Sequence, residues 1–388
     1  MACERIRLAL VLNLDIIKDI KTPAYVLDEA LLENNLKTLA EIKAKTGCKI
    51  LLALKAFSMY STFSLVKEYL DGVAASSVNE ARLGYEEFGK DVHMCAPAYK
   101  EQDMADIIEY SDHIIFNSFS QWQKHKAEVQ SSGRGIVCGL RINPEKSMAP
   151  AAIYDPCASG SRFGIRFCDM QADLEGISGL HFHTLCEQNA DALEATLEAV
   201  EEKFGKYLKN MKWVNFGGGH HITRLDYDIE KLCLLINNFK SKYNVAVILE
   251  PGEAVALNVG YLVTSVVDVI KNDINIAVLD ASAATHMPDV LEMPYRPNVV
   301  DAGNPNEKKY TYRFAGNTCL AGDIVGEYSF DYELKIGDKL VFEDMAHYTM
   351  VKNNTFNGVG LPDILVYSRK KELKVVKEFG YLDFKQRV

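Results

Sequence analysis

A single lysine at the end of an apolar run is the first candidate for chemistry in this chain. The apolar residues 51–54 precede Lys55, and Ala56 and Phe57 follow it. A buried amine is costly unless it has a partner or a task. Burial also depresses the pKa of an ammonium group, and the neutral amine is the form that makes a Schiff base with a carbonyl group. On this run alone, a lysine that extends its amine to the rim of the fold is an equally acceptable interpretation.

Three further groups follow or end apolar runs later in the chain. They are an imidazole, a glycine triplet and a carboxylate: His183, the glycines Gly217, Gly218 and Gly219, and Glu250. Taken singly, each has an ordinary structural interpretation, as a satisfied core histidine, a tight turn and a salt-bridged acid. Together with Lys55 they describe a site for pyridoxal phosphate. The amine meets the aldehyde, backbone N–H groups hold the phosphate, the imidazole stacks on the ring and the carboxylate meets the ring nitrogen.

The elements that must position these groups alternate between apolar strands and amphipathic helices. Eight strands are expected, at 49–56, 72–77, 91–96, 113–118, 135–142, 177–184, 212–217 and 245–250. Helical segments such as 62–69, 78–88, 104–110 and 190–204 lie between most of them. This pattern predicts a (β/α)8 TIM-type barrel rather than a doubly wound open sheet. Function in such a barrel belongs to the C-terminal ends of the strands, where the four candidate groups fall.

Past about residue 260 the chain becomes β-rich, with few helical intervals. Apolar and β-branched residues dominate the segments 261–270, 276–280, 310–314, 339–342 and 365–367. These segments predict a mostly antiparallel β domain. We expect two packed domains, a pyridoxal-phosphate-binding barrel over 22–258 and a β domain over 259–388, the latter joined by residues 1–21. A short strand over 22–28 opens the barrel range.

Composition excludes several classes of protein. The 388 residues are 48% hydrophobic and 25% charged, as in ordinary globular proteins. A formal net charge of −10 provides no basic surface for nucleic acid. No apolar run approaches the roughly 20 residues needed to span a bilayer, and no signal peptide is expected. The nine cysteines form no CxxC pair, so neither a disulfide framework nor a metal site is indicated. These features predict a cytoplasmic protein without membrane or nucleic-acid partners.

Several short motifs occur in a fixed order from about Thr22 to the C-terminus. They are the lysine run, Phe182-His183, Phe216-Gly217-Gly218-Gly219, Glu250-Pro251-Gly252, Thr318-Cys319-x-x-x-Asp323 and Phe356-Asn357-Gly358. In this order they resemble the fold-type III, pyridoxal-phosphate-dependent decarboxylases, which include the ornithine and diaminopimelate decarboxylases. The segments 285–295 and 317–323 are similar to the branch of this family that acts on carboxynorspermidine and carboxyspermidine.

The resemblance implies a role for each matching residue of the barrel. Lys55 would hold the cofactor as a Schiff base, His183 would stack on its ring, and Glu250 would keep the ring nitrogen protonated. The residues that would hold the phosphate are Gly217, Gly218, Gly219 and Tyr348.

Cys319 is implied to act across a subunit interface. In the family, a cysteine at this place reaches the active site of the other subunit of a head-to-tail homodimer and protonates the α-carbon. Taken alone, a cysteine in a β domain is more often a small buried hydrophobic residue. Only the resemblance assigns it to catalysis.

The chain departs from the family pattern at two positions. Leu320 stands where ornithine and diaminopimelate decarboxylases have an acidic residue after the cysteine, so a short substrate would lose its anchor. Glu253 stands where many relatives have an arginine that contacts the phosphate. A longer substrate with secondary and terminal ammonium groups fits better. The substrate-binding residues that we expect are Glu250, His286, Asp289 and Asp323, although the last three are equally acceptable as ordinary loop residues.

The sequence therefore predicts a homodimeric, pyridoxal-phosphate-dependent decarboxylase of carboxynorspermidine or carboxyspermidine in polyamine biosynthesis. A diaminopimelate or ornithine decarboxylase on the same scaffold is the alternative. A racemase is disfavoured because the cysteine motif occupies the place of its tyrosine base. A non-catalytic binding protein is disfavoured because both Lys55 and Cys319 are present.

Overall fold

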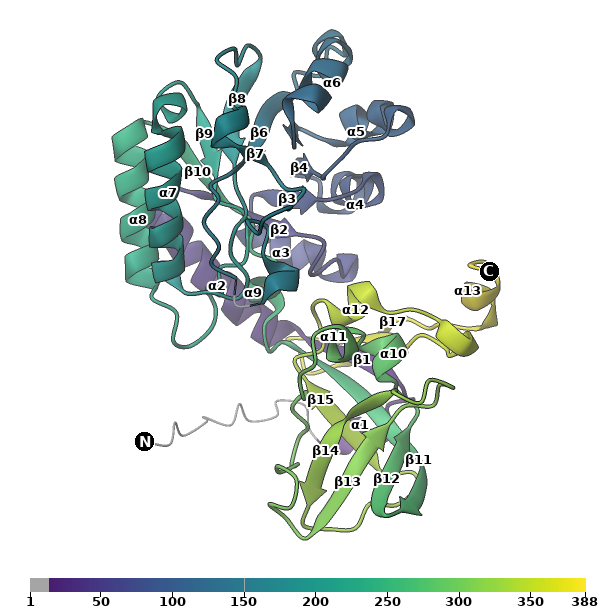
Figure 1. Cartoon of the computed structure of the whole chain (residues 1–388). Coiled ribbons are helices and arrows are strands. Elements are labelled where there is room, and N and C mark those ends of the chain that lie inside the picture. The colour runs from purple at the N-terminus through teal and green to yellow at the C-terminus, as the bar shows by residue number, and fades with distance from the viewer. Residues whose placement is uncertain (1–13, 150) are drawn as a thin grey trace. The chain divides into compact units, whose positions relative to one another are not determined.

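The computed structural model describes residues 14–149 and 151–388, which divide into two compact units (Figure 1). Residues 33–255 form one unit, which we call the barrel unit. Residues 14–32 and 256–388 belong to the other, which we call the β unit.

Eight parallel strands close into a ring in the barrel unit. Their order is β5–β4–β3–β2–β10–β9–β8–β6, and an additional pairing of β5 with β6 closes the ring. This confirms the predicted TIM-type barrel. The strands are β2 (Lys49–Ala53), β3 (Gly72–Ala75), β4 (Asp91–Cys95), β5 (His113–Phe116), β6 (Val137–Asn143), β8 (Ile177–His181), β9 (Trp213–Asn215) and β10 (Ala246–Leu249), and the short β7 (Ile165–Arg166) pairs with β6 outside the ring.

The helices of this unit lie on the outside of the strands (Figure 1). They are α2 (Glu29–Thr46), α3 (Phe63–Tyr69), α4 (Val78–Leu83), α5 (Met104–Tyr110), α6 (Phe119–Ser131), α7 (Ala190–Leu208), α8 (Ile229–Tyr243) and α9 (Glu253–Ala256). The predicted helix 78–88 is α4 followed by one π-helical turn, Gly84–Phe88.

Local sequence explains where the two longest of the later helices begin and end. The Asn189 side chain accepts a hydrogen bond from Ala190 N at the start of α7, and the Asp228 side chain accepts one from Lys231 N in α8. These caps satisfy backbone donors that have no partner within the helix. Helix α8 ends at Asn244, which adopts the left-handed conformation with φ 54°. Each helix buries one apolar stripe, as amphipathic helices on a barrel must.

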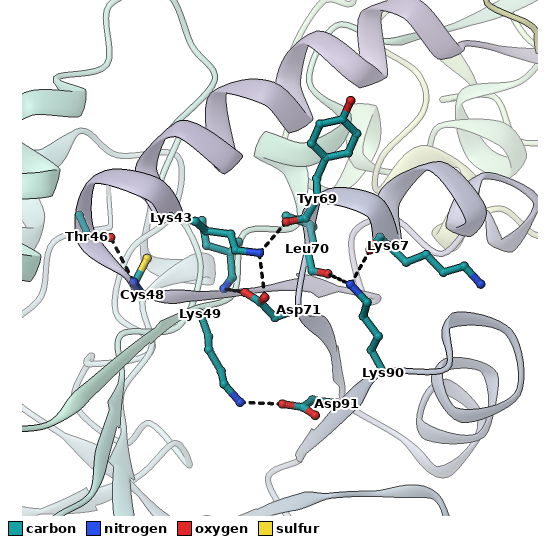
Figure 2. A network of polar contacts seen from close by, with 11 residues as sticks. Lys43, Thr46, Cys48, Lys49, Lys67, Tyr69, Leu70, Asp71, Lys90 and Asp91 are labelled. Atoms are coloured by element: carbon teal, nitrogen blue, oxygen red, sulfur yellow. Dashed lines mark hydrogen bonds and ion pairs between the residues drawn. The ribbon is translucent and has the colours of Figure 1, made fainter.

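Polar contacts link the N-terminal ends of β2, β3 and β4 (Figure 2). Lys43 Nζ of α2 donates to Asp71 Oδ1 at 2.7 Å, and Ile50 N donates to Asp71 Oδ2 at 2.9 Å. Lys49 pairs with Asp91 at 2.8 Å. Charge-assisted hydrogen bonds of this kind contribute about 1.5–3 kcal/mol when shielded from water and less at the surface. This end of the barrel therefore contributes to stability and leaves the opposite end for function.

The β unit is built on one mixed, mostly antiparallel sheet, as predicted. Its order is β14–β13–β12–β11–β1–β16–β17, with β15 paired to β11, and only β1–β16 and β12–β13 are parallel among the described strands. The strands are β1 (Ala24–Asp28), β11 (Gly260–Asn272), β12 (Ile274–Leu279), β13 (Tyr310–Ala315), β14 (Ile324–Phe330), β15 (Lys339–Glu343), β16 (Asp363–Tyr367) and β17 (Leu373–Lys377). The short helices are α1 (Leu14–Asp19), α10 (Ala283–His286), α11 (Asp289–Glu292), α12 (Thr349–Lys352) and α13 (Tyr381–Lys385).

Strand β1 lies in this sheet, whereas residues 22–28 were expected in the barrel range. It pairs antiparallel with β11 and parallel with β16. All five of its residues are buried, and strands flank it on both edges. Its apolar side chains pack with those of α1, β11 and β16. In the described part of the chain no helix has the length and apolar character needed to cross a membrane.

Candidate active site

Four neighbouring strands of the barrel bring the predicted barrel residues to one end of it. Lys55 follows β2, Glu250 follows β10, Gly217 follows β9 and His183 follows β8, and these strands are consecutive in the ring. Each strand ends one to three residues earlier than expected, so these side chains lie in the loops that leave the sheet. All four are therefore at the C-terminal end of a barrel, where loops carry functional groups.

The contacts of His183 define the state of the Lys55 amine. Gly218 N donates to His183 Nδ1 at 2.8 Å, so Nδ1 carries no proton. A neutral imidazole then has its proton on Nε2. Nε2 lies 3.3 Å from Lys55 Nζ, and a hydrogen bond from Nε2–H requires a lone pair on the amine. The geometry thus favours a neutral, nucleophilic Lys55.

The electrostatic surroundings favour the same state. Desolvation lowers the pKa of Lys55, the positive charge of Arg141 lowers it further, and Glu250 acts in the opposite direction. The Lys55 side chain keeps a solvent-exposed face, which limits the size of this shift but not its direction. Burial, followed by Lys55 and Arg141, also holds the pKa of His183 well below its usual range. A lysine in this state can react with an aldehyde at neutral pH.

Arg141 is a site residue that sequence reasoning missed. It lies on β6, is 8% exposed, and donates from Nη2 to His183 O at 3.3 Å. Its guanidinium stacks 4.4 Å from the centre of the Phe163 ring. A buried arginine on an apolar strand was the available signal, because such a charge requires partners.

Glu250 is a buried carboxylate with a defined partner on each oxygen. Asn215 Nδ2 donates to Oε1 at 2.7 Å, and His181 Nε2 lies 3.2 Å from Oε2. Burial by itself raises the pKa of Glu250, but His181, then Asn215 and Lys55, hold it below its usual value. The carboxylate is therefore ionised at neutral pH, and each oxygen keeps a lone pair for a further donor. Asn215 and His181 were also missed, although both are polar residues on apolar strands.

The glycine triplet is required by the close packing of the strand ends. A Cβ at Gly217 would lie 2.5 Å from Phe182 O, one at Gly218 would lie 2.3 Å from Glu250 O, and one at Gly219 would lie 2.0 Å from Leu185 O. Gly217 and Gly219 also have positive φ angles of 70° and 81°.

Two amides of the triplet already donate within the protein. Gly217 N donates to Asn215 Oδ1, and Gly218 N donates to His183 Nδ1, both at 2.8 Å. Among the described residues, the Gly219 N–H has no acceptor. Phosphate binding by all three glycines stays a prediction, and Gly219 offers the amide for it.

Glu253 faces a histidine next to the triplet. Its Oε1 lies 3.5 Å from His221 Nε2, and both side chains are largely buried. Arg224 Nη1 lies 3.4 Å from the other ring nitrogen of His221. The position that carries a phosphate-contacting arginine in many relatives therefore carries an acid engaged with an imidazole.

Cys319 lies in the β unit at the tip of the loop between β13 and β14. The residue is exposed, and its backbone N–H donates to Asn357 Oδ1 at 2.8 Å. Asn357 holds a left-handed conformation with φ 59°. The Thr318-Cys319 and Phe356-Asn357-Gly358 motifs, which are distant in sequence, are thus joined by this hydrogen bond.

Asp323 forms hydrogen bonds that hold the same loop in place. It is 2% exposed, and its Oδ2 accepts hydrogen bonds from Ser282 Oγ and Thr318 Oγ1, both at 2.7 Å. Its Oδ1 accepts one from Ala284 N at 3.2 Å. These contacts give the carboxylate a structural task, and substrate binding by Asp323 stays a prediction.

The other predicted residues of the β unit also have protein partners. His286 is fully buried, with Nε2 3.0 Å from Gly360 O, and burial lowers its pKa to about 4. Asp289 forms an ion pair with Lys352. Tyr348 immediately precedes α12 and is half-buried. Their roles in binding substrate or phosphate stay predictions.

The residues of the barrel fit pyridoxal phosphate. A neutral lysine suits the aldehyde, an ionised buried carboxylate suits a protonated ring nitrogen, and the glycine turn offers an amide to a phosphate. Fold and site together define a pyridoxal-phosphate-dependent enzyme with a TIM-type barrel and a β domain.

Comparison with known proteins identifies the family. The model of the pyridoxal-dependent decarboxylase, C-terminal sheet domain family matches residues 24–346. A carboxynorspermidine/carboxyspermidine decarboxylase of Campylobacter jejuni is 48% identical over 95% of this chain and 98% of its own. A carboxyaminopropylagmatine decarboxylase of Synechocystis is 42% identical over 96% of each chain. The crystal structure of the C. jejuni carboxynorspermidine decarboxylase with norspermidine superimposes with a TM-score of 0.90 at 47% identity, covering 95% of this chain and 100% of that one. The chain belongs to the pyridoxal-dependent decarboxylase family and is a carboxy-lyase.

Proposed function

We propose that the chain removes the α-carboxylate of carboxynorspermidine or carboxyspermidine and so produces norspermidine or spermidine. The observation that carries this proposal is the 48% identity to a decarboxylase of these substrates along 95% of the chain. The exposed Leu320 supports it, because an apolar residue there provides no anchor for the ammonium group of a short diamino acid.

The residues of the barrel prepare the site for this reaction. Pyridoxal phosphate, when bound, supplies the electron sink that stabilises negative charge on the α-carbon after CO2 leaves. Lys55 supplies the amine for its aldehyde, and the Nε2–H of His183 keeps that amine neutral. Glu250 would hold the proton on the ring nitrogen, since it is an ionised acceptor in a buried setting.

The return of a proton to the α-carbon is assigned to Cys319. We propose a cytoplasmic homodimer in which this thiol serves the active site of the other subunit. The exposed position of Cys319 on a loop fixed by Asn357 supports this role, because a donor to another subunit must be accessible and held in place.

A second candidate substrate is carboxyaminopropylagmatine. The 42% identity to the Synechocystis enzyme favours it, over 96% of both chains. The distal end of carboxyaminopropylagmatine is a guanidinium group instead of an ammonium group. The two groups differ in hydrogen-bonding geometry. Diaminopimelate and ornithine decarboxylases are more distant, at 24% and 26% identity over 87% and 54% of this chain.

The test is CO2 release by the purified, cofactor-loaded protein with five substrates in parallel. These are carboxynorspermidine, carboxyspermidine, carboxyaminopropylagmatine, meso-diaminopimelate and L-ornithine. We expect kcat/KM for the first two to exceed that for the last two by about 10⁴-fold, because a site built to hydrogen-bond the ammonium groups of a triamine rejects substrates that lack them. Dominant turnover of carboxyaminopropylagmatine would replace the proposal by the second candidate, and dominant turnover of either amino acid would overturn both.

A further inference from the structure

Two side chains that no motif of the family resemblance includes hold the carboxylate of Glu250. His181 is the last residue of β8 and Asn215 is the last residue of β9, so both come from the strands next to β10 in the ring. Their contacts to the two carboxylate oxygens measure 3.2 Å and 2.7 Å. Both side chains are almost fully buried, at 2% and 0% exposure.

The contacts of His181 define its tautomer. Nε2 faces Glu250 Oε2, whereas Nδ1 is buried and has no hydrogen-bond partner among the described residues. A proton on Nδ1 would be a buried donor without an acceptor, which is unfavourable. The imidazole is therefore neutral and donates from Nε2. Burial lowers the pKa of His181 in agreement with this, although Glu250 opposes the shift.

Asn215 joins the carboxylate to the glycine triplet. Its Nδ2 donates to Glu250 Oε1, and its Oδ1 accepts from Gly217 N at 2.8 Å. The two contacts fix the orientation of the amide, because the carboxylate can only accept and the backbone N–H can only donate. The backbone adds a further link, since Glu250 N donates to Gly217 O at 2.8 Å.

We propose that His181 and Asn215 are positioning residues that keep Glu250 ionised and oriented toward the ring nitrogen of pyridoxal phosphate. Asn215 also couples this orientation to the turn that carries the glycine triplet. A buried carboxylate needs two such donors, because desolvation alone would protonate it and remove the acceptor that the ring N–H requires. The inference rests on the role of Glu250 given under the proposed function, but it does not depend on which substrate is decarboxylated.

The test compares the affinity of the protein for pyridoxal phosphate with that for the analogue in which a carbon replaces the ring nitrogen. The ratio of the two dissociation constants isolates the contact between Glu250 and the ring nitrogen. Three variants remove or restore these contacts. Asn215→Asp keeps the acceptor for Gly217 N but places a second carboxylate against Glu250, so that the two carboxylates share one proton and Glu250 loses its full charge. His181→Met removes the N–H, and His181→Gln restores an N–H. Glu250→Met removes both oxygens at similar length and calibrates the contact itself.

We expect the wild-type protein to prefer pyridoxal phosphate over the analogue by about tenfold or more, the value of one charge-assisted hydrogen bond. Asn215→Asp and His181→Met should lose most of this preference, and His181→Gln should keep most of it. If both affinities fall equally in Asn215→Asp and His181→Met, these residues are merely structural and the proposal is overturned.

Two further outcomes are distinguishable. If Glu250→Met retains the preference, Glu250 does not face the ring nitrogen, and the proposal fails together with that part of the proposed function. If His181→Met does not fold, Asn215→Asp decides alone, because it is nearly isosteric and keeps the contact to Gly217 N. An unchanged preference in Asn215→Asp then overturns the proposal.

Discussion

Asp323→Ala separates a structural role of Asp323 from a role in substrate binding. The substitution removes the acceptor of two hydroxyl groups, Ser282 Oγ and Thr318 Oγ1, and of two backbone N–H groups, those of Ala284 and Thr318. A buried donor left without an acceptor costs about 1–3 kcal/mol. The hydroxyl groups can rotate toward other acceptors, but the backbone N–H groups cannot. We therefore expect the free energy of unfolding to fall by about 2–4 kcal/mol, on the basis of these contacts.

The same change should disorder the loop that presents Cys319. Thr318 directly precedes Cys319 and donates to Asp323. Loss of the carboxylate therefore removes a hydrogen bond that holds this loop in place. We expect kcat to fall by about 10²-fold, the usual value of one positioned proton donor. KM should change little, because the loss affects proton delivery instead of ground-state binding.

The assay combines urea unfolding with steady-state CO2 release. Asp331→Ala is a control in the same unit, because Asp331 forms a largely exposed ion pair with Lys308, and its loss should cost at most about 1 kcal/mol. A large rise in KM for the triamine substrate with unchanged stability would refute the structural assignment. Asp323 would then be the anchor for an ammonium group that the sequence analysis expected.

Four further predictions follow from the site. Lys55→Ala should abolish turnover and the near-visible absorbance of lysine-linked cofactor, and retained activity would refute the assignment of the nucleophile. Cys319→Ala should bind cofactor with unchanged affinity but turn over about 10²-fold more slowly, and wild-type kcat would mean that another group donates the proton. Leu320→Asp should raise the turnover of L-ornithine relative to carboxynorspermidine by about tenfold with little loss of stability, because Leu320 is 44% exposed. Since the pKa of Lys55 is lowered, cofactor incorporation should rise with pH and reach half its maximum below 10.5, whereas a midpoint at or above 10.5 would exclude the neutral amine described here.

The barrel was predictable because its strands are buried on both faces. A parallel strand under a layer of helices must be apolar throughout, so each one stands out as a short apolar run. Lys55 and Glu250 interrupt or end such runs and were visible for that reason. The strand ends were less predictable, because seven of the eight ring strands end one to three residues before the expected position, whereas β6 continues one residue past it.

The β unit was less predictable because its edge strands lack that pattern. Strand β17 (Leu373–Lys377) has mostly exposed residues, and β14 (Ile324–Phe330) contains Gly326 and Glu327, so neither forms an apolar run. Strand β1 was visible as a strand, but nothing in four hydrophobic residues and an aspartate indicates which sheet it joins. Pairing between segments more than 230 residues apart, such as Tyr25 with Leu262, is not encoded in either segment alone.

The polar residues behind the site were not predictable from motifs for a related reason. Asn215 and His181 do no chemistry that a pattern can indicate, and their importance lies in what they contact. A buried anion is stable only if hydrogen-bond donors surround it. Glu250 at a strand end therefore predicts that such donors exist, but the sequence does not indicate which residues they are. The structure identifies these donors as His181 and Asn215, because neighbouring strands of a closed barrel bring their last residues side by side. The charge of Glu250 is therefore a property of three adjacent strands. A substitution at the end of any of them should weaken cofactor binding before it alters the choice of substrate.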